Sequence, residues 1–470
     1  MSGIDEVSPA PAVRHRLIIR HTQQDAVAFV VDNGNARLPT VVSEDRHTAD
    51  VDHINAAVAQ TFALGTTVLR KLSHGEPIDG IVERVHELEL HGARGTAPAN
   101  LRWCAASDLP IFPDPEDRHA IALWSGTPGS DAAVVDGRDW MRPGWFDAAC
   151  DWIELSMREA VLGVPLEIRQ PRSWASSCVL HVRTHGADYY FKALPRSGRV
   201  EWAVTRFLAN QFANMLPAVV AVEPERRWML LAACTGHNLE TVTDVTLWER
   251  AAHAYGWLQV ACSDHVDALE KLGCPVRTLD ALARSIDSLA GDAIALRPGQ
   301  DGGLTHVEFE RFSRAVPMLQ RRCQALAASR IRSTIEHGDL WPGNIFVDAN
   351  ACTVIDWEDV AIAHPFVSLA PLLVGMANAG LGSRSNVERI ERAYLAAFRR
   401  FGSAAQLQRM LQLAAPLCYI EMAARYRHQP PSVVMLHPWM RDLIPQTVRL
   451  VLSRIPDGDS LDDGALGQTT

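Results

Sequence analysis

The last third of the chain holds an aspartate, an asparagine and a second aspartate at a spacing that could support phosphoryl transfer. Asp339 lies in the segment HGDLWPGN, Asn344 ends that segment five positions later, and Asp356 follows twelve residues further on. One carboxylate can face the proton of an acceptor hydroxyl, while an amide and a second carboxylate can bind the metal that bridges the phosphates. The pattern therefore favours a site that holds magnesium-ATP and activates a hydroxyl.

A predicted hairpin positions these side chains. Residues 331–335 read as a short strand running into His337, and residues 344–348 and 352–356 read as two strands with turn residues between them. Closing that hairpin brings Asn344 and Asp356 together, so that both can bind one cation. The alternative is an aspartate in an Asx-turn and an unrelated acidic residue at a strand end. The complete set of three residues favours the metal site.

The segments HGDLWPGNI and VIDWEDVAIAHPF resemble the aminoglycoside phosphotransferase and choline kinase group of small-molecule kinases. The resemblance implies a two-lobed protein-kinase-like fold with ATP and Mg²⁺ as cofactors. It implies that Asp339 is the catalytic base and that Asn344 and Asp356 are the metal ligands. His337 is grouped with the catalytic residues, where we expect it to support the loop backbone rather than to carry protons.

Differences from protein kinases point to a small-molecule acceptor that bears a hydroxyl. Gly338 stands where protein kinases usually have arginine, and Trp357-Glu358 stands where they have Phe-Gly. The chain also departs from the small-molecule kinases, which often carry an aspartate shortly after the HPF segment. Ser368 is found there instead, so we expect the helices around it to be anchored differently.

The nucleotide lobe is predicted from strands on both sides of Lys192. Residues 178–182 and 189–194 read as a hairpin, and Lys192 lies in its aromatic second strand. An ammonium group buried there needs a partner. In a kinase lobe the partners are the nucleotide phosphates and a helix glutamate, for which Glu201 is the candidate. Glu223 and Glu225 are rivals for that role, and an edge-strand lysine facing solvent is the alternative for Lys192.

Two further segments are candidates for nucleotide contacts. The turn SWASSC at 173–178 contains no glycine, so Ser176 and Ser177 would have to replace the usual glycines near the phosphates. The apolar strand WMLLAAC at 228–234 resembles a hinge strand, where Leu231 and Ala233 would meet the adenine.

Helical periodicity dominates the rest of the chain, at residues 247–262, 279–289, 309–329, 386–401, 406–427 and 438–455. From Ala361 to Ile455 there are eleven arginines and four acidic residues, which lowers the expectation of a polycationic acceptor such as an aminoglycoside. The alternative is that these arginines lie on solvated helix faces.

The first 124 residues are expected to form a separate small α/β domain. Predicted strands at 16–20 and 26–31, a helix at 51–62 and the segment RWCAASDLP faintly resemble a Nudix hydrolase. The predicted helix lacks the glutamates that Nudix chemistry needs, so we expect a catalytically inactive module. The full prediction is an α+β chain with this module at 1–124, a linker at 125–139, a β-rich kinase-like N-lobe at 140–240, a helical C-lobe at 241–456 and a disordered tail at 457–470.

Composition excludes several other classes of protein. A net charge of -10 argues against non-specific nucleic-acid binding. No apolar run is long enough to span a membrane, and the start of the chain lacks a signal-peptide pattern. The nine cysteines form no C-x-x-C pair, which favours reduced thiols in the cytoplasm.

Two main functions follow. The first is transfer of the γ-phosphoryl group of ATP to a hydroxyl of a small molecule. The second is a regulatory pseudokinase that binds nucleotide without transferring phosphate, which the complete set of Lys192, Asp339, Asn344 and Asp356 disfavours. A pyrophosphohydrolase is a distant third. The sequence names neither the acceptor nor the oligomeric state.

Overall fold

A computed structural model describes the chain at residues 12–44, 47–75, 80–93, 95–126, 137–196, 200–427, 434, 437 and 439–455. Most of the predicted linker and all of the predicted tail lie outside these residues. Contacts divide the chain into two compact units, Met1–Arg199 with Val219–Ala233, and Val200–Ala218 with Cys234–Thr470.

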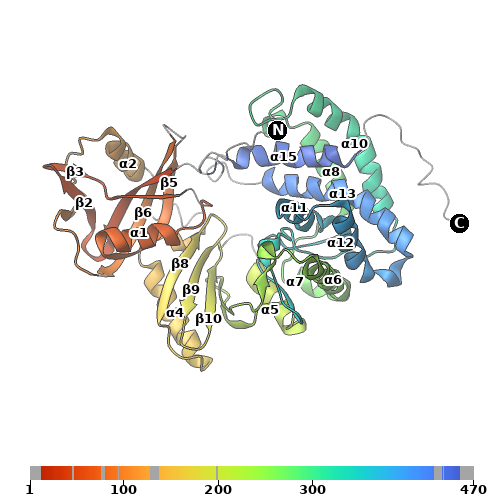
Figure 1. Ribbon diagram of the computed structural model, residues 1–470, viewed down its shortest axis with the longest axis horizontal. Helices are drawn as coiled ribbons and strands as arrows, with labels where there is room; N and C mark the ends of the chain where they lie inside the picture. Colours follow the sequence, from red (N-terminus) through yellow and green to blue (C-terminus); the bar gives the residue numbers. More distant parts are fainter. Residues whose placement is uncertain are drawn as a thin grey trace, which may run out of the picture. The chain divides into compact units, whose positions relative to one another are not determined.

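The first unit begins with a seven-stranded mixed sheet in the order β3-β2-β1-β6-β5, with β4 paired to β1 and β7 paired to β2. Helices α1 and α2 cover its two faces (Figure 1). Along β1, Leu17 and Ile19 pack toward α1 while Ile18 packs toward α2, because successive strand residues point to opposite faces. The elements are β1 Ala12–His21, β2 Ala26–Asp32, β3 Asn35–Arg37, β4 Thr40–Glu44, α1 Asp52–Phe62, β5 Leu64–His74, β6 Ile81–Ala93, β7 Leu101–Ala105 and α2 Pro115–Gly126.

The longest strand of this sheet, β6, was not predicted from the sequence. Its buried positions include Arg84, Glu87 and Glu89, which break the apolar alternation expected of a strand. The structure compensates for buried Glu87 by pairing it with Arg20 at 3.1 Å and Arg70 at 2.6 Å. These partners lie on neighbouring strands, so the sequence around β6 does not indicate them.

A second sheet follows in the first unit, with five antiparallel strands in the order β11-β12-β10-β9-β8. Helix α4 Trp145–Glu159 packs on it through Trp145, which meets Phe191 and Trp228 at ring distances of 5.9 and 6.2 Å. The strands are β8 Glu167–Ser173, β9 Cys178–Arg183, β10 Asp188–Ala193, β11 Val219–Glu223 and β12 Trp228–Ala232.

The second unit is mainly helical, and the predicted helices are present with shifted ends. The helix predicted from 309 begins at His306, because Thr305 and Glu308 form a capping box there. None of the described helices combines the length and hydropathy that a bilayer-spanning segment needs. The helices are α5 Glu201–Gln211, α6 Val245–Cys262, α7 Val266–Lys271, α8 Leu279–Ala290, α9 Ala293–Leu296, α10 His306–Ala327, α11 Ala370–Asn378, α12 Arg384–Ala396, α13 Ala404–Arg427 and α15 Met440–Ser453.

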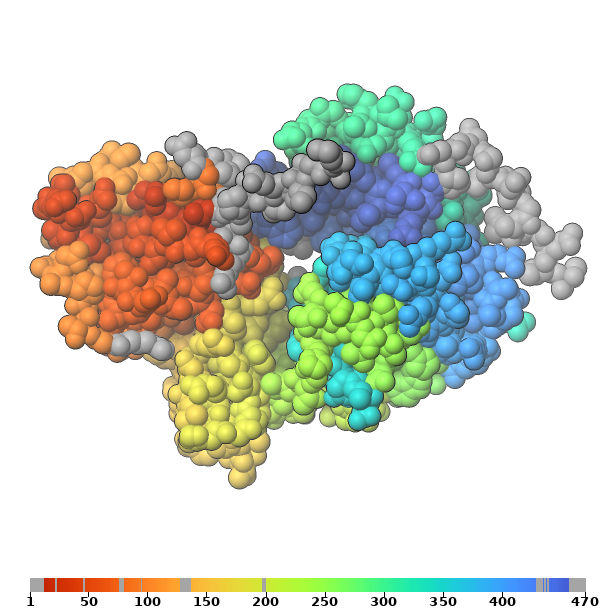
Figure 2. Space-filling view, viewed as in Figure 1, coloured from red at the N-terminus to blue at the C-terminus, as the bar shows by residue number. Residues whose placement is uncertain are grey.

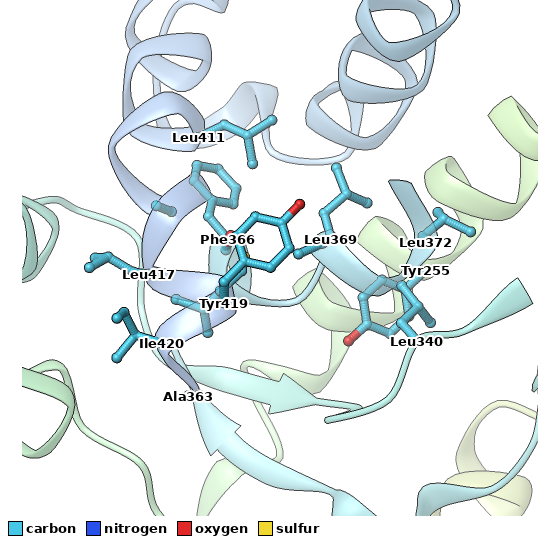
Figure 3. Close-up of a cluster of buried hydrophobic side chains, with 14 of the residues drawn as sticks. Tyr255, Leu340, Ala363, Phe366, Leu369, Leu372, Leu411, Leu417, Tyr419 and Ile420 are labelled. Carbon is cyan, nitrogen blue, oxygen red and sulfur yellow. Dashed lines mark hydrogen bonds between the residues drawn. The ribbon is translucent and has the colours of Figure 1, made fainter. Parts of the chain in front are cut away.

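Short strands carry the predicted catalytic segment through this helical unit. They are β13 His237–Asn238, β14 Thr334–Glu336, β15 Ile345–Val347, β16 Cys352–Val354 and β17 Ala361–Ala363. One large apolar core lies behind them, and Figure 3 shows Tyr255 beside Leu340 and Leu372 in that core. Phe366 and Tyr419, a residue of α13, extend the same cluster. The catalytic segment therefore rests on closely packed side chains, which limits its movement.

Candidate active site

The predicted hairpin is confirmed and lies in the second unit. Strands β15 and β16 pair with Ile345 opposite Val354, and Ile355 N donates to Asn344 O at 2.9 Å. At the other end, Asp348 Oδ1 accepts from the amides of residues 350 and 351 and closes the turn. Asn344 and Asp356 therefore lie at the same, open end of the hairpin.

Asp339 and Asn344 are in direct contact. Asn344 Nδ2 donates to Asp339 O at 3.0 Å and lies 3.3 Å from Asp339 Oδ2. Burial raises the pKa of Asp339 to about 6, with Asp356 and Asp359 adding to the shift and Arg425 and Asn344 opposing it. Asp339 is therefore a stronger base than an exposed aspartate and is still ionised above neutral pH.

His337 is fully buried and is engaged by main-chain groups at both ring nitrogens. Its Nε2 lies 2.9 Å from Ile355 O, and its Nδ1 lies 3.3 Å from Asp339 N. These partners imply a ring that donates from Nε2 and accepts at Nδ1. Burial lowers the pKa of His337 to about 4, so the ring is neutral at pH 7. The geometry is that of a support for the catalytic loop and the strand end, not of a proton carrier.

Gly338 is required by the space around it as well as by its backbone conformation. Its φ is 86°, a left-handed conformation that L side chains rarely adopt. A Cβ here would overlap the carbonyl oxygen of Asp359 and would lie 2.8 Å from Arg425 Nη1. The space beside Gly338 is therefore occupied by Asp359 and by the guanidinium of Arg425.

Three carboxylates converge beside the hairpin, from Glu201 on α5 and from Asp356 and Glu358. One oxygen atom of each lies within 4.8 Å of the others. Carboxylate oxygens suit a hard divalent cation such as Mg²⁺, and carboxylates this close repel one another unless a positive charge neutralises them. From the sequence, Glu201 was expected to be the partner of Lys192. Glu358 was not predicted as a ligand, although Glu358 is two residues from Asp356.

A buried charge cluster under the catalytic loop was also missed. Glu336 Oε1 accepts from Gly338 N at 2.8 Å, and Glu336 Oε2 faces Arg277 Nη1 at 3.6 Å and Arg425 Nη1 at 3.9 Å. Arg277 also pairs with Glu421 at 3.1 Å. Burial raises the pKa of Glu336, and the two arginines oppose that shift. Arg425 belongs to the last turn of α13, so nothing near the motif points to it.

Neutral side chains anchor the strand that precedes the loop. Gln259 Nε2 donates to Ile335 O at 2.9 Å and to Ser368 Oγ at 3.0 Å, while Tyr394 OH donates to Gln259 Oε1 at 2.6 Å. Tyr255 OH accepts from His337 N at 3.1 Å. Ser368, the departure noted in the sequence, therefore belongs to an uncharged network.

The first unit holds the remaining candidate residues, beginning with Lys192. It lies on β10, the central strand of the second sheet, opposite Met229 on β12 and Val179 on β9. Only 8% of Lys192 is exposed. The alternative of an edge-strand lysine that faces solvent is therefore wrong.

The proposed phosphate turn is tight. Ser173 pairs with Cys178, and Trp174 N donates to Ser177 O at 2.8 Å. Ser176 is buried and Ser177 is partly buried. A phosphate at this turn would therefore meet main-chain groups rather than the serine side chains.

The predicted hinge residues follow the same sheet. Leu231 pairs with Tyr190 on β10, and Ala233 N donates to Asp188 O at 3.0 Å. The amide of Ala233 is thus engaged inside the sheet, which leaves its carbonyl as the group that could meet an adenine.

The model of the "Phosphotransferase enzyme family" (APH) matches residues 167–413, which is more than half of the chain. The chain belongs to the APH phosphotransferase family. The APH match contains every candidate site residue named from the sequence, and it establishes the kinase-like character of this region of a mixed α+β protein. It begins only at β8, so it gives the N-terminal sheet no family, and the Nudix resemblance has no support. It ends before Arg425.

Several solved APH-like structures are similar to the chain. A choline kinase from Cryptosporidium parvum is 13% identical, with 61% of this chain and 88% of that chain covered and a TM-score of 0.45. A Plasmodium vivax ethanolamine kinase is 12% identical, with 70% and 95% covered and a TM-score of 0.46. A spectinomycin phosphotransferase in complex with ADP and spectinomycin is 8% identical, with 62% and 94% covered and a TM-score of 0.42. No protein with a curated description matches the chain by sequence. The APH assignment therefore rests on the family model.

Proposed function

We propose that the protein transfers the γ-phosphoryl group of ATP to a hydroxyl of a small molecule in a Mg²⁺-dependent reaction. The observation that carries the proposal is the contact of Asn344 with Asp339, made at the hairpin end that also bears Asp356. Phosphoryl transfer requires a base and metal-binding side chains close together, and this contact supports those roles for the three residues.

Each residue has a separate task in this proposal. Asp339 orients the acceptor hydroxyl and takes its proton, and its raised pKa of about 6 suits a base that works near neutral pH. Asn344 and Asp356 hold the metal, and Glu358 joins them from the carboxylate cluster. Bound Mg²⁺ neutralises charge on the phosphates. Lys192 binds the phosphates, and Glu201 orients the lysine or the metal.

The proposal assigns the larger parts of the chain accordingly. Residues 140–240 form the nucleotide lobe, in which the 174–177 turn with Ser176 and Ser177 covers the phosphates and Leu231 and Ala233 meet the adenine. Residues 241–456 form the catalytic and acceptor lobe, and residues 1–124 form an accessory domain joined by 125–139. We place the protein in the cytoplasm, where its nine unpaired cysteines would stay reduced.

The acceptor in this proposal is a small hydroxyl-bearing molecule, and the arginines between Ala361 and Ile455 do not indicate its charge. Arg389 pairs with Glu249 at 2.8 Å, Arg427 with Asp292 at 2.6 Å and Arg449 with Glu308 at 3.0 Å. Part of the excess positive charge between Ala361 and Ile455 is therefore matched by acids from other helices. The acceptor search should include neutral, anionic and cationic alcohols.

The test is Mg²⁺-dependent ADP release from the full-length protein across a panel of sugars, amino alcohols, nucleosides and antibiotics. Asp339→Asn is the blank. Asp348→Asn, which changes an aspartate at the far end of the same hairpin, is the matched control. ADP release that needs an acceptor and disappears only in Asp339→Asn supports the proposal. ATP binding without release under any condition would instead support the regulatory pseudokinase, and release of a mononucleotide would support a pyrophosphohydrolase.

A further inference from the structure

Strand β8 is bound along its length by the N-terminal domain, defined here as residues 12–126. Val51 N donates to Pro171 O at 3.0 Å, and Ser173 N donates to Ala49 O at 2.9 Å. Strand β8 is the outer strand of the second sheet, with β9 on its other side. The segment before α1 therefore covers an edge that would otherwise expose unpaired main-chain groups.

Side chains of β8 extend this contact. Arg169 Nη1 lies 2.9 Å from Asp52 Oδ2, and Arg172 Nε lies 3.5 Å from Asp50 Oδ1. About half of each arginine side chain is exposed, so these pairs contribute little stability. Arg169 precedes the two main-chain contacts and Arg172 lies between them, so both pairs fit the same alignment of β8 with the N-terminal domain.

Gln170 is the buried centre of the contact. It is 2% exposed, its Oε1 accepts from Val68 N at 2.8 Å, and its Nε2 donates to Val68 O at 2.9 Å. Asn55 Nδ2 also lies 3.3 Å from Gln170 Oε1. The side-chain amide thus pairs with β5 as a neighbouring strand would. Because both groups of Val68 are buried with it, the contact cannot slip without leaving polar groups unsatisfied.

The end of β8 leads directly into the turn at 174–177. Ser173, held by Ala49, is the last residue before that turn, and the ring of Trp174 lies 5.5 Å from the ring of His47. Figure 2 shows the red and orange surface of the N-terminal domain continuing into the yellow surface of the second sheet. The N-terminal domain therefore contacts the turn on which the nucleotide lobe of the proposed kinase depends.

We propose that the N-terminal domain is a working part of the nucleotide lobe, in which Gln170 and the segment 49–51 are positioning elements for the 174–177 turn. This inference rests on the proposed function, because it assigns the turn to ATP. It differs from the expectation of an independent module on a linker, since such a module could be loosened without any effect on nucleotide binding.

The test replaces Gln170 with methionine, which keeps the length of the side chain but removes the hydrogen bonds of its amide, including both to Val68. Gln24→Met, at an exposed position of the same domain, is the matched control. In the full-length protein, Gln170→Met is expected to speed amide hydrogen exchange in residues 173–178. It is also expected to weaken ATP binding about five- to tenfold, the factor that corresponds to about one lost hydrogen bond. The KM for the acceptor should stay unchanged.

Unchanged exchange and unchanged ATP affinity in Gln170→Met, together with a lower melting temperature, would overturn the inference and leave an independent module. If Gln170→Met does not fold, Asp52→Asn is the milder variant, and it should shift both readouts in the same direction by a smaller factor. If the wild-type protein binds no ATP, the proposed function fails, while the exchange of residues 173–178 still decides whether the N-terminal domain holds the turn.

Discussion

The catalytic loop at 336–344 and the turn at 174–177 are held in different ways. The loop is fixed from inside its own unit by buried side chains: Gln259 reaches it from α6, and Arg425 reaches Glu336 at its start from α13. The turn is fixed by main-chain groups and one buried amide at the border of the N-terminal domain. Single side-chain substitutions should therefore damage the loop, whereas damage to the turn should follow loosening of the N-terminal domain.

The largest effect expected among the loop's neighbours is at the carboxylate cluster of Glu201, Asp356 and Glu358. Asp356→Asn should lower kcat by about 10³-fold, because a bound cation stabilises much of the charge that develops on the phosphoryl group during transfer. Glu358→Gln should cost much less and mainly raise the Mg²⁺ concentration needed for half-maximal rate. A Mg²⁺ titration of both variants measures the two effects. Equal losses of kcat in the two variants would contradict the larger role assigned to Asp356.

Gly338→Ala should break the loop by overlap rather than by conformation alone. The new Cβ would meet Asp359 and Arg425, so a loss of more than about 2 kcal/mol in the free energy of unfolding is expected together with most of the activity. Gly380→Ala is the control, because its φ is 75° but nothing lies near its Cβ. It should cost only about 1–2 kcal/mol. Equal losses in urea unfolding would show that space at Gly338 is not limiting.

Arg425→Met should test the charge cluster under the loop. The change leaves the buried Glu336 with Arg277 alone, and breaking such buried pairs costs about 3 kcal/mol. The double variant Arg425→Met with Glu336→Gln should recover part of that stability, because no charge is then stranded. Urea unfolding of the wild-type protein, Arg425→Met, Glu336→Gln and the double variant gives the coupling energy between the two residues. Additive changes in the free energy of unfolding would exclude a direct interaction.

The smallest effect near neutral pH concerns the N-terminal domain, where the ring of His15 lies 5.5 Å from that of His53 and 5.2 Å from that of His86. Burial lowers the pKa of His15 to about 3, helped by His53 and Arg84, and lowers that of His86, helped by His15 and Lys71. Folding therefore favours their neutral forms. Their contribution is complete above about pH 6.5, the ordinary value in the unfolded chain, and is lost as the pH falls toward 3.

The slope of that loss should approach about 1.4 kcal/mol per pH unit for each buried histidine. His86→Phe should flatten the acid limb when the melting temperature is followed from pH 8 to pH 5. An acid limb as steep in His86→Phe as in the wild-type protein would contradict the assignment to this cluster.

The sequence predicted those parts of the molecule whose cause is local. The hairpin around Asn344 and Asp356, the strand of Lys192 and most helices follow from periodicity and turn residues within a few positions. Strand β6 was missed because its buried glutamates are matched by arginines on other strands. Arg425 and Gln170 were missed for the same reason, since each acts on a segment far away in the chain. The approach of Glu201 to Asp356 and Glu358 likewise depends on tertiary packing.

The most direct test of the central claim is the rate of phosphoryl transfer in Asp339→Asn, measured beside its affinity for ATP. If Asp339 is the base, kcat should fall by about 10²–10⁴-fold, the range of a lost general base, while the dissociation constant for ATP stays within about twofold of the wild-type value. Asp348→Asn should match the wild-type protein in both. A turnover rate in Asp339→Asn close to that of the wild-type protein would contradict the role of Asp339 as the base.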